Sequence, residues 1–237
     1  MNKDEKDGAD EGGNFRTLSG RENHGLLIIF EGIDGAGKTT QAIRVTDWLK
    51  QKGLAAVSFS EPTRGVYGQK LREIILHGRG KMSPQEEMDL FLKDREEDVQ
   101  KNILPALRQN YIVIMDRYYH SNMAYQGALG IDSDYIRALN EKIAPKPDMV
   151  IILDLDVRTG LHRINTFRRE KENYFEKEDY LKKVSRIFSD MQGDYIHHIP
   201  ASLPLEEVNA RIDRKIMNLL HKSSSRIKFS SPDKALG

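Results

Sequence analysis

The clearest chemical signature in this chain is the stretch Gly-Ile-Asp-Gly-Ala-Gly-Lys-Thr-Thr at residues 32–40. It fits the pattern Gly-x-x-x-x-Gly-Lys-[Ser/Thr], in which backbone N–H groups of a glycine-rich loop surround phosphate oxygens. Lys38 would reach the β- and γ-phosphates of a nucleoside triphosphate, and the Thr39 hydroxyl would bind Mg²⁺. We therefore expect Lys38 to be exposed in a nucleotide-binding cleft. The predicted loop residues are Gly32, Ile33, Asp34, Gly35, Ala36, Gly37, Lys38, Thr39 and Thr40.

The elements on either side of this loop have the order that phosphate binding requires. Residues 26–30 are all apolar and predict a short buried strand. After the loop, Ala42, Val45 and Leu49 recur with helical spacing, which predicts a helix through about Trp48. The N-terminus of such a helix adds unpaired N–H donors and a favourable dipole for an anion. A glycine-rich turn that matches the pattern by chance is the alternative, and the correct flanking elements argue against it.

The rest of the chain alternates apolar runs with helical segments. The runs are residues 55–59, 111–115 and 149–155, with a weaker one at 195–199. A last amphipathic helix carries its apolar residues at Leu205, Val208, Ile212, Ile216 and Leu219. This alternation predicts an α/β fold: a parallel sheet of about five strands with helices on both faces.

Ligands of such sheets bind beyond the carboxyl ends of the strands. We therefore expect the site among residues 31–40, 60–64, 116–118 and 154–158. Asp116 there can sit in the outer shell of Mg²⁺, and the planar guanidinium of Arg117 suits phosphate oxygens. An Asp–Arg pair that only caps the next helix is the alternative reading.

Composition narrows the functional classes. The 37 basic and 36 acidic residues give a net charge of +1, which argues against a bulk surface for a nucleic-acid polymer but permits a local basic cleft. Without cysteine, the chain forms no disulfide and uses no thiolate chemistry. No apolar run approaches the roughly 20 residues of a membrane helix. The polar first twenty residues do not resemble a secretory signal. We expect a soluble, cytoplasmic protein without a membrane partner.

The two ends of the chain differ from its middle. Residues 1–23 are polar and lack apolar periodicity, and residues 223–237 are rich in Ser, Lys and Arg. We interpret both as disordered tails, which leaves one domain at residues 24–222.

Four motifs occur in the order and spacing of the thymidylate kinase family, which this chain resembles over roughly residues 25–220. They are GIDGAGKTTQ at 32–41, SEPTRGVYGQKLRE at 60–73, DLFLKDREEDV at 89–99 and DRYYHSNMAYQG at 116–127. The resemblance implies a P-loop nucleoside-monophosphate-kinase fold and the ATP- and Mg²⁺-dependent phosphorylation of dTMP to dTDP. It also implies the small-molecule substrates dTMP and ATP, and a homodimer.

The resemblance also implies roles for individual residues. Phe91 matches a ring that stacks on thymine, Arg95 an Arg that meets the base, and Tyr125 an aromatic residue beside the deoxyribose. The implied substrate-binding residues are Glu61, Arg72, Phe91, Arg95, Arg117, Ser121, Asn122, Tyr125 and Gln126. The implied catalytic residues are Lys38, Asp34, Asp116, Arg117, Arg168 and Arg169, and the implied metal ligands are Thr39 and Asp116.

Residues 165–176 resemble the family's mobile lid, which closes on ATP. Gly35 stands where some relatives carry a catalytic Arg, so Arg168 or Arg169 in the lid is the better candidate. A charged, solvent-exposed linker is the alternative. Pro200 stands where many relatives have Asp, which leaves the adenine contacts open.

Phosphoryl transfer fits these residue types, because an anionic acceptor oxygen needs alignment and charge neutralisation more than a strong base. Phe91 and Arg95 share a helix face, so a ring and a guanidinium can address one planar base. Core packing for Phe91 and Tyr125, with a surface ion pair for Arg95, is the other reading. The alternative functions are a kinase for another nucleoside monophosphate or a deoxynucleoside, and a nucleotide-dependent switch protein.

Overall fold

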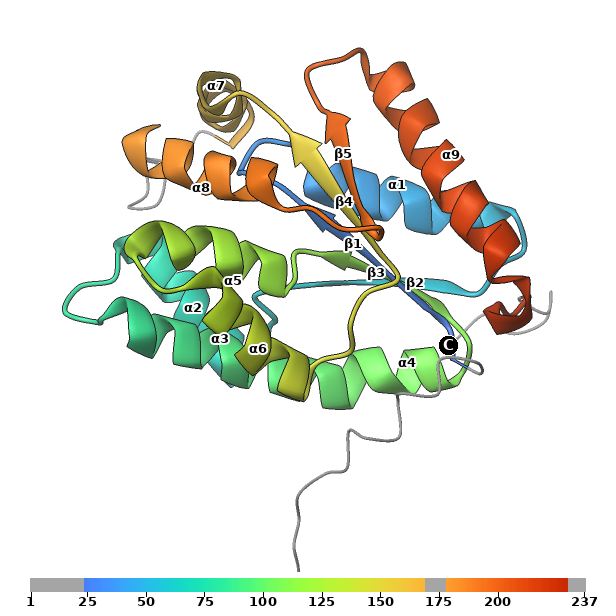
Figure 1. Cartoon of the computed structure of the whole chain (residues 1–237), viewed down its shortest axis with the longest axis horizontal. Helices are drawn as coiled ribbons and strands as arrows, with labels where there is room; N and C mark the ends of the chain where they lie inside the picture. Colours follow the sequence, from blue (N-terminus) through green and yellow to red (C-terminus); the bar gives the residue numbers. More distant parts are fainter. Residues whose placement is uncertain (1–23, 169–177, 230–237) are drawn as a thin grey trace, which may run out of the picture.

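A five-stranded parallel sheet forms the centre of the protein, as a computed structural model shows for residues 24–168 and 178–229 (Figure 1). Its strands are β1 (Leu26–Glu31), β2 (Ala56–Ser60), β3 (Ile112–Asp116), β4 (Met149–Asp154) and β5 (Ile196–Pro200). They follow the order β2-β3-β1-β4-β5, and each pairs in parallel with its neighbour. The predicted fold class is confirmed, and every predicted strand boundary lies within one residue of the observed one.

The apolar runs become strands because helices cover both faces of the sheet. All residues of β1 and β3, which lie side by side, are buried. Such strands read as continuous apolar runs, without the alternation of a half-exposed strand. In Figure 1, α1 (Lys38–Gln51) and α9 (Leu205–Lys222) lie together on one side of the sheet, and α5 (Tyr119–Tyr125), α6 (Ser133–Ile143) and α8 (Glu178–Asp190) lie on the other.

The two helices on the first side bury the stripes that their sequences predict, with one exception. In α1, Ala42, Val45 and Leu49 are buried. In α9, Val208, Ile212 and Ile216 are buried, whereas Leu205 in the first turn is 62% exposed. The stripe ends at Leu220 and not at the expected Leu219, because a helix residue four positions after Ile216 returns to the same face.

The remaining helices are α2 (Val66–His77), α3 (Pro84–Asp98), α4 (Leu104–Arg108) and α7 (Val157–Arg168). Helix α3 begins with a capping box, in which Ser83 accepts from the N–H of Glu86 and Glu86 accepts from the N–H of Ser83. A π-helical turn, Val99–Ile103, joins α3 to α4 just before Pro105. Proline has no N–H and its ring crowds the preceding turn, which disfavours an unbroken α-helical ladder there.

The expected disordered C-terminal tail from residue 223 onward is wrong for residues 223–229. Arg226 forms a two-pronged ion pair with Asp148 and donates to the carbonyl oxygens of His24 and Gly25. The N–H of Ala55 donates to the carbonyl of Lys228 at 3.0 Å. These contacts fasten the segment beside the start of β2, so the folded part of the chain extends at least to residue 229. The predicted N-terminal tail (1–23), most of the predicted lid (169–176) and residues 230–237 lie outside the described residues.

Within the described ranges, no helix has the length and apolar character that crossing a membrane requires.

Candidate active site

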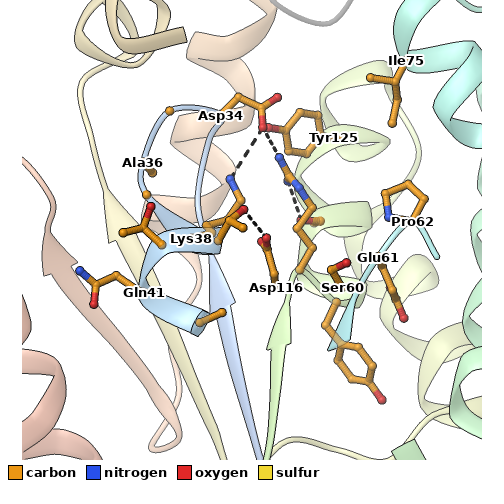
Figure 2. Close-up of a pocket in the computed structure, with 18 of the residues that line it drawn as sticks. Asp34, Ala36, Lys38, Gln41, Ser60, Glu61, Pro62, Ile75, Asp116 and Tyr125 are labelled. Carbon is orange, nitrogen blue, oxygen red and sulfur yellow. Dashed lines mark hydrogen bonds and ion pairs between the residues drawn. The ribbon is translucent and has the colours of Figure 1, made fainter. Parts of the chain in front are cut away.

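Most of the predicted site residues surround a single cavity of about 1090 Å³ at the carboxyl ends of β1, β2 and β3. Figure 2 shows Asp34, Lys38 and Asp116 converging there, with Tyr125 beside Asp34 and with Glu61 and Pro62 on the opposite wall. The predicted residues that line it are Asp34, Gly35, Ala36, Gly37, Lys38, Thr39, Thr40, Glu61, Arg72, Phe91, Arg95, Asp116, Arg117, Ser121, Asn122, Tyr125 and Gln126. Gly32 and Ile33, the first two residues of the predicted loop, do not line the cavity. Neither do residues 154–158, which start at the last residue of β4.

The phosphate loop folds tightly because two of its glycines adopt backbone angles that other residues avoid. Gly35 has φ 79° and Gly37 has φ 97°. A Cβ atom on Gly35 would lie 2.4 Å from the carbonyl oxygen of Gly160 in α7. An Arg at position 35 would therefore need the loop and α7 to move apart, which explains in physical terms why this loop carries glycine there.

Lys38 is not exposed, contrary to our expectation, and only 6% of it is accessible. Its ammonium donates to the carbonyl oxygen of Ile33 at 2.8 Å and lies 3.7 Å from a carboxylate oxygen of Asp34. Burial, together with the neighbouring charge of Arg117, lowers the pKa of Lys38 to about 8. Lys38 is nevertheless among the residues that line the cavity, although almost all of its surface is covered.

Thr39 and Asp116 form the predicted metal-binding pair. The Thr39 hydroxyl donates to Oδ2 of Asp116 at 2.5 Å. The other carboxylate oxygen, Oδ1, is buried and has no hydrogen-bond partner among the described residues. Mg²⁺ in kinases is bound by one or two oxygen side chains together with substrate phosphates and water. A hydroxyl beside a carboxylate with an unused oxygen fits that pattern.

Arg117 follows β3 in a left-handed backbone conformation, with φ 73°. Its N–H donates to the carbonyl of Phe30 at 3.0 Å, and its guanidinium pairs with Asp34 and donates to Ser121 at 3.1 Å. Burial opposes the charged form, but Asp34, Asp116 and Glu31 outweigh it and raise the pKa of Arg117. The residue is a permanent cation at the boundary between the phosphate loop and the rest of the cavity, as a phosphate clamp requires.

Glu31, at the end of β1, lies in the range 31–40 where we expected the site, but we assigned it no role from the sequence. It is fully buried and accepts from the N–H groups of Tyr118 and Ser121 and from the Ser121 hydroxyl, at 2.6–3.1 Å. Burial raises the pKa of Glu31, and these hydrogen bonds oppose that shift. The carboxylate fixes the turn that carries Arg117. Its only sequence signal is an acid at the end of an otherwise apolar strand.

On the far wall, Arg95 is buried, which excludes the reading of a surface ion pair. Both oxygens of Glu61 accept from its guanidinium, and Asn122 accepts from it at 2.7 Å. Burial raises the pKa of Glu61 and the charge of Arg95 opposes this. Both carboxylate oxygens accept from Arg95, and this geometry favours the ionised form of Glu61. The Glu61 carboxylate is therefore used to hold Arg95.

The hydrogen bonds continue from Arg95 along the wall. Asn122 uses its oxygen on Arg95, so its Nδ2 donates to Oε1 of Gln126 at 3.0 Å. Phe91 is half-buried one turn before Arg95 and lines the cavity, as does the half-buried Tyr125. The Tyr125 ring centroid lies 5.3 Å from the Arg117 guanidinium carbon. The structure thus presents two aromatic rings and a set of oriented polar groups to the same space.

Arginines also fasten the mouth of the cavity. Arg72 donates to the carbonyl oxygens of Pro62 and Thr63, at 2.5 and 3.3 Å, and so holds the loop after β2. Arg163 of α7, which we did not predict, donates to the carbonyls of Gly35 and Ala201 at 3.4 and 3.1 Å. Arg163 thus links the phosphate loop to the residue after β5. This is the region in which Pro200 left the adenine contacts unpredicted.

Of the two predicted lid arginines, Arg168 is the last residue of α7. Arg169 lies outside the described residues.

The fold and the cavity define a P-loop nucleotide-binding protein with the architecture of nucleoside-monophosphate kinases. The sequence model of thymidylate kinase matches residues 30–212. A probable thymidylate kinase of Archaeoglobus fulgidus is 46% identical over 196 residues, which are 83% of this chain and 97% of that protein. Thymidylate kinases of Desulfotalea psychrophila and Akkermansia muciniphila are 46% and 44% identical over 198 residues, 84% of this chain and 97% and 94% of theirs. The chain belongs to the thymidylate kinase family.

Proposed function

We propose that this protein transfers the γ-phosphoryl group of ATP to dTMP and releases dTDP and ADP. The observation that carries the proposal is one cavity with two unlike halves. Its phosphate-loop half contains Lys38 and Arg117, and its opposite wall contains Phe91, Arg95 and Tyr125. A volume of about 1090 Å³ exceeds what most single small ligands fill, about 300–1,000 Å³, and suits two nucleotides end to end.

ATP occupies the phosphate-loop half. The N–H groups of residues 34–39 and the Lys38 ammonium surround the β- and γ-phosphates, and the N-terminus of α1 adds its dipole. Beyond the loop, the cavity wall is apolar, with Ile43, Leu203, Leu205 and Val208. This side takes the adenine ring, and Arg163 ties it to the loop.

The Thr39 hydroxyl and the unused oxygen of Asp116 would hold Mg²⁺. The ion supplies charge neutralisation at the phosphate oxygens of ATP.

The reaction is an in-line displacement that needs no strong general base. A phosphate oxygen of dTMP forms the new bond to the γ-phosphorus, while the bond from that phosphorus to the β,γ-bridging oxygen breaks and ADP leaves with the oxygen. Both partners are already anionic, so the enzyme mainly aligns them and offsets negative charge. Arg117 binds the acceptor phosphate, and Asp34 orients Arg117 through their ion pair. One lid arginine, Arg168 or Arg169, completes the charge compensation when the lid closes.

The nucleoside of dTMP lies on the opposite wall. The Phe91 ring stacks on thymine, Tyr125 covers the deoxyribose carbon that carries a hydroxyl in ribonucleotides, and Asn122 and Gln126 meet the base edge. Among the described residues, side chains accept from four of the five N–H groups of Arg95, which leaves one N–H on Nη2 for a base carbonyl. Thymine presents such an acceptor at O4.

The family resemblance supports two further parts of the proposal, a homodimer and a cytoplasmic location. Sedimentation equilibrium of the full chain tests the first. A monomer at micromolar concentration would contradict it.

A product assay tests the central activity. The full chain is incubated with ATP, Mg²⁺ and dTMP, and ADP and dTDP are both quantified. The proposal predicts equal amounts of the two products, and EDTA removes the activity. Tight ATP binding without dTDP formation would instead favour a nucleotide-dependent switch protein.

A further inference from the structure

Arg95 donates more hydrogen bonds to protein side chains than contact with a base would require. It is 1% exposed, and Nε and Nη2 donate to the two oxygens of Glu61. Its Nη1 donates to Oδ1 of Asn122 and also to Oδ1 of Asn140. Glu61 and Asn122 line the cavity, whereas Asn140 does not. Asn140, one of the three side chains that accept from Arg95 among the described residues, therefore does not face the cavity.

Asn140 reaches Arg95 from α6, on the side away from the cavity. Its side chain is fully buried, and its Nδ2 donates to the carbonyl of Ile136 on its own helix at 2.8 Å. A guanidinium has no acceptor, so the amide can only present its oxygen to Arg95. The amide nitrogen of Asn140 therefore donates to the helix backbone, and its oxygen accepts from Arg95.

A further carboxylate, that of Asp98, lies near Arg95 on the same helix. Asp98 lies one turn further along α3, and its Oδ2 is buried without a hydrogen-bond partner among the described residues. If the Nη1 proton facing Asn140 lost its acceptor, the guanidinium would gain by turning toward this carboxylate, because an unpaired buried donor is costly. Such a turn would redirect the remaining Nη2 proton. Asn140 opposes it.

We propose that Asn140 is a positioning residue, which fixes the guanidinium of Arg95 so that its free N–H addresses the carbonyl of the pyrimidine acceptor. The inference rests on the proposed dTMP kinase activity. It predicts a specific defect: poorer use of dTMP and weaker discrimination against dCMP, with the ATP half of the cavity unchanged.

The first test is Asn140→Leu, which keeps the volume and removes the acceptor. We expect kcat/KM for dTMP to fall about ten-fold or more and the dTMP/dCMP ratio of kcat/KM to narrow, because a free guanidinium no longer favours one base edge. KM for ATP should stay within about two-fold. The matched control is Ser133→Ala on the same helix, which removes a hydrogen bond from α6 to the Met123 carbonyl without touching Arg95. All three quantities should stay near wild type in this control.

A double-mutant cycle separates positioning from a merely structural role. Asn140→Leu is measured again in an Arg95→Met background, where Glu61 can take up a proton since burial already raises its pKa. If Asn140 acts through Arg95, the second substitution costs less than about two-fold in this background. If Asn140→Leu does not fold, Asn140→Ser, whose hydroxyl is too short to reach Arg95, takes its place under the same criteria.

Two results overturn the inference alone: unchanged dTMP kinetics in folded Asn140 variants, or a loss of equal size with and without Arg95. A wild-type enzyme that does not phosphorylate dTMP at all overturns the proposed function, and this inference with it.

Discussion

Lys38 shows how one residue combines two requirements of a phosphate site. Binding of a triphosphate requires the positive charge of Lys38. The residue is nonetheless almost completely buried, and its ammonium already donates to the carbonyl oxygen of Ile33. The low pKa of about 8 reflects that burial. A bound triphosphate would favour the charged form again, because opposite charge nearby raises the pKa of an ammonium.

Lys38→Met should therefore inactivate the enzyme while it keeps the fold, since methionine retains most of the buried stem. Removing one preorganised donor from developing charge typically costs about 2.7–4 kcal/mol, so kcat should fall by roughly 10²–10³. Steady-state kinetics and circular dichroism measure the two effects. The control is Lys50→Met at the end of the same helix, which should be neutral. Near-normal kcat in a folded Lys38→Met variant would remove this residue from the mechanism.

Tyr125 is expected to exclude ribonucleotides, because its ring fills the space beside the sugar. Tyr125→Ala should narrow the preference for dTMP over ribo-TMP in kcat/KM by about ten-fold. Tyr125→Phe keeps the ring and should keep the preference. If both variants lose dTMP activity and the ratio does not change, the ring serves only core packing.

For individual residues, the sequence predicts which residues lie in the site better than it predicts their hydrogen-bond partners. The loop, Asp116, Arg117, Phe91 and Arg95 could be placed because their motifs carry them. The contacts of Arg95 could not, since Glu61 lies 34 positions before it and Asn140 45 positions after it. The exposure of Lys38 was mispredicted, because a pattern of residues does not show how closely the loop packs on its own lysine.

Between elements, His198 joins β5 to both β4 and the residue that follows α8. One ring nitrogen lies 3.0 Å from Oδ1 of Asp154, and the other lies 2.9 Å from the carbonyl of Met191. Both partners are acceptors, so the two contacts favour the ring form in which both nitrogens carry hydrogen and the ring is charged. Burial opposes this charge, but the two hydrogen bonds raise the pKa of His198 above its usual value.

A raised pKa makes this contribution to stability depend on pH in a defined direction. It is fully present below the pKa of the unfolded chain, about 6.5, and is lost as pH rises through the higher folded value. Hence the stability lost in His198→Gln, measured by urea unfolding, should be larger at pH 6 than at pH 9. The control is His197→Gln. Burial lowers the pKa of that neighbour, so its pH dependence should have the opposite sign. A pH-independent loss in His198→Gln would contradict the charged ring.

The predicted lid, residues 165–176, begins within the last turn of α7 and is expected to supply the arginine that the loop lacks. An arginine on a transferring phosphoryl group is worth roughly 10³–10⁵ in kcat in GTPases, so Arg168→Ala combined with Arg169→Ala should lower kcat strongly. ATP affinity should change only mildly. Arg158→Ala at the exposed start of α7 serves as the control, since it removes a charge from the same helix. Full activity in the double variant would mean that residues 165–176 are a charged linker.

Helices and strands could be predicted where their apolar pattern is continuous. Segments whose structure depends on contacts with residues far away in the sequence could not. All five strands followed from short apolar runs. The ordered segment at 223–229 did not, because Ser-rich sequence usually indicates a disordered tail. Its order depends on Arg226, whose partners lie 78 and 202 positions earlier in the chain. We did not predict the π-helical turn before Pro105 from the sequence.

For the whole molecule, the parallel sheet explains why residues from distant motifs meet. The carboxyl ends of β1, β2 and β3 carry the loop, Glu61 and Arg117 to one edge, where α3 and α5 add the acceptor wall. The alternation of strands and helices predicts this edge as the site, but not which strand ends take part. Residues 154–158 after β4 face elsewhere: Asp154 pairs with His198 and Arg158 with Glu178.

Discrimination between thymine and cytosine is the strictest test of this arrangement. The free N–H of Arg95 can pair with O4 of thymine, whereas cytosine presents a donor at that position. An unsatisfied buried donor costs about 1–3 kcal/mol, and more if it is charged, so dCMP should be at least about ten-fold poorer. dUMP keeps O4 and lacks only a methyl group, worth about 0.8 kcal/mol of apolar burial.

The most direct measurement is an ADP-release panel in which the full chain, with ATP and Mg²⁺, receives dTMP, dUMP, dCMP, dGMP or UMP. We expect the order dTMP, then dUMP, then dCMP in kcat/KM, with purine monophosphates excluded by size. Arg95→Met should flatten the difference between dTMP and dCMP and leave ATP affinity intact. A wild-type enzyme that prefers dCMP or a purine monophosphate would contradict the account, even with the phosphate loop correctly assigned.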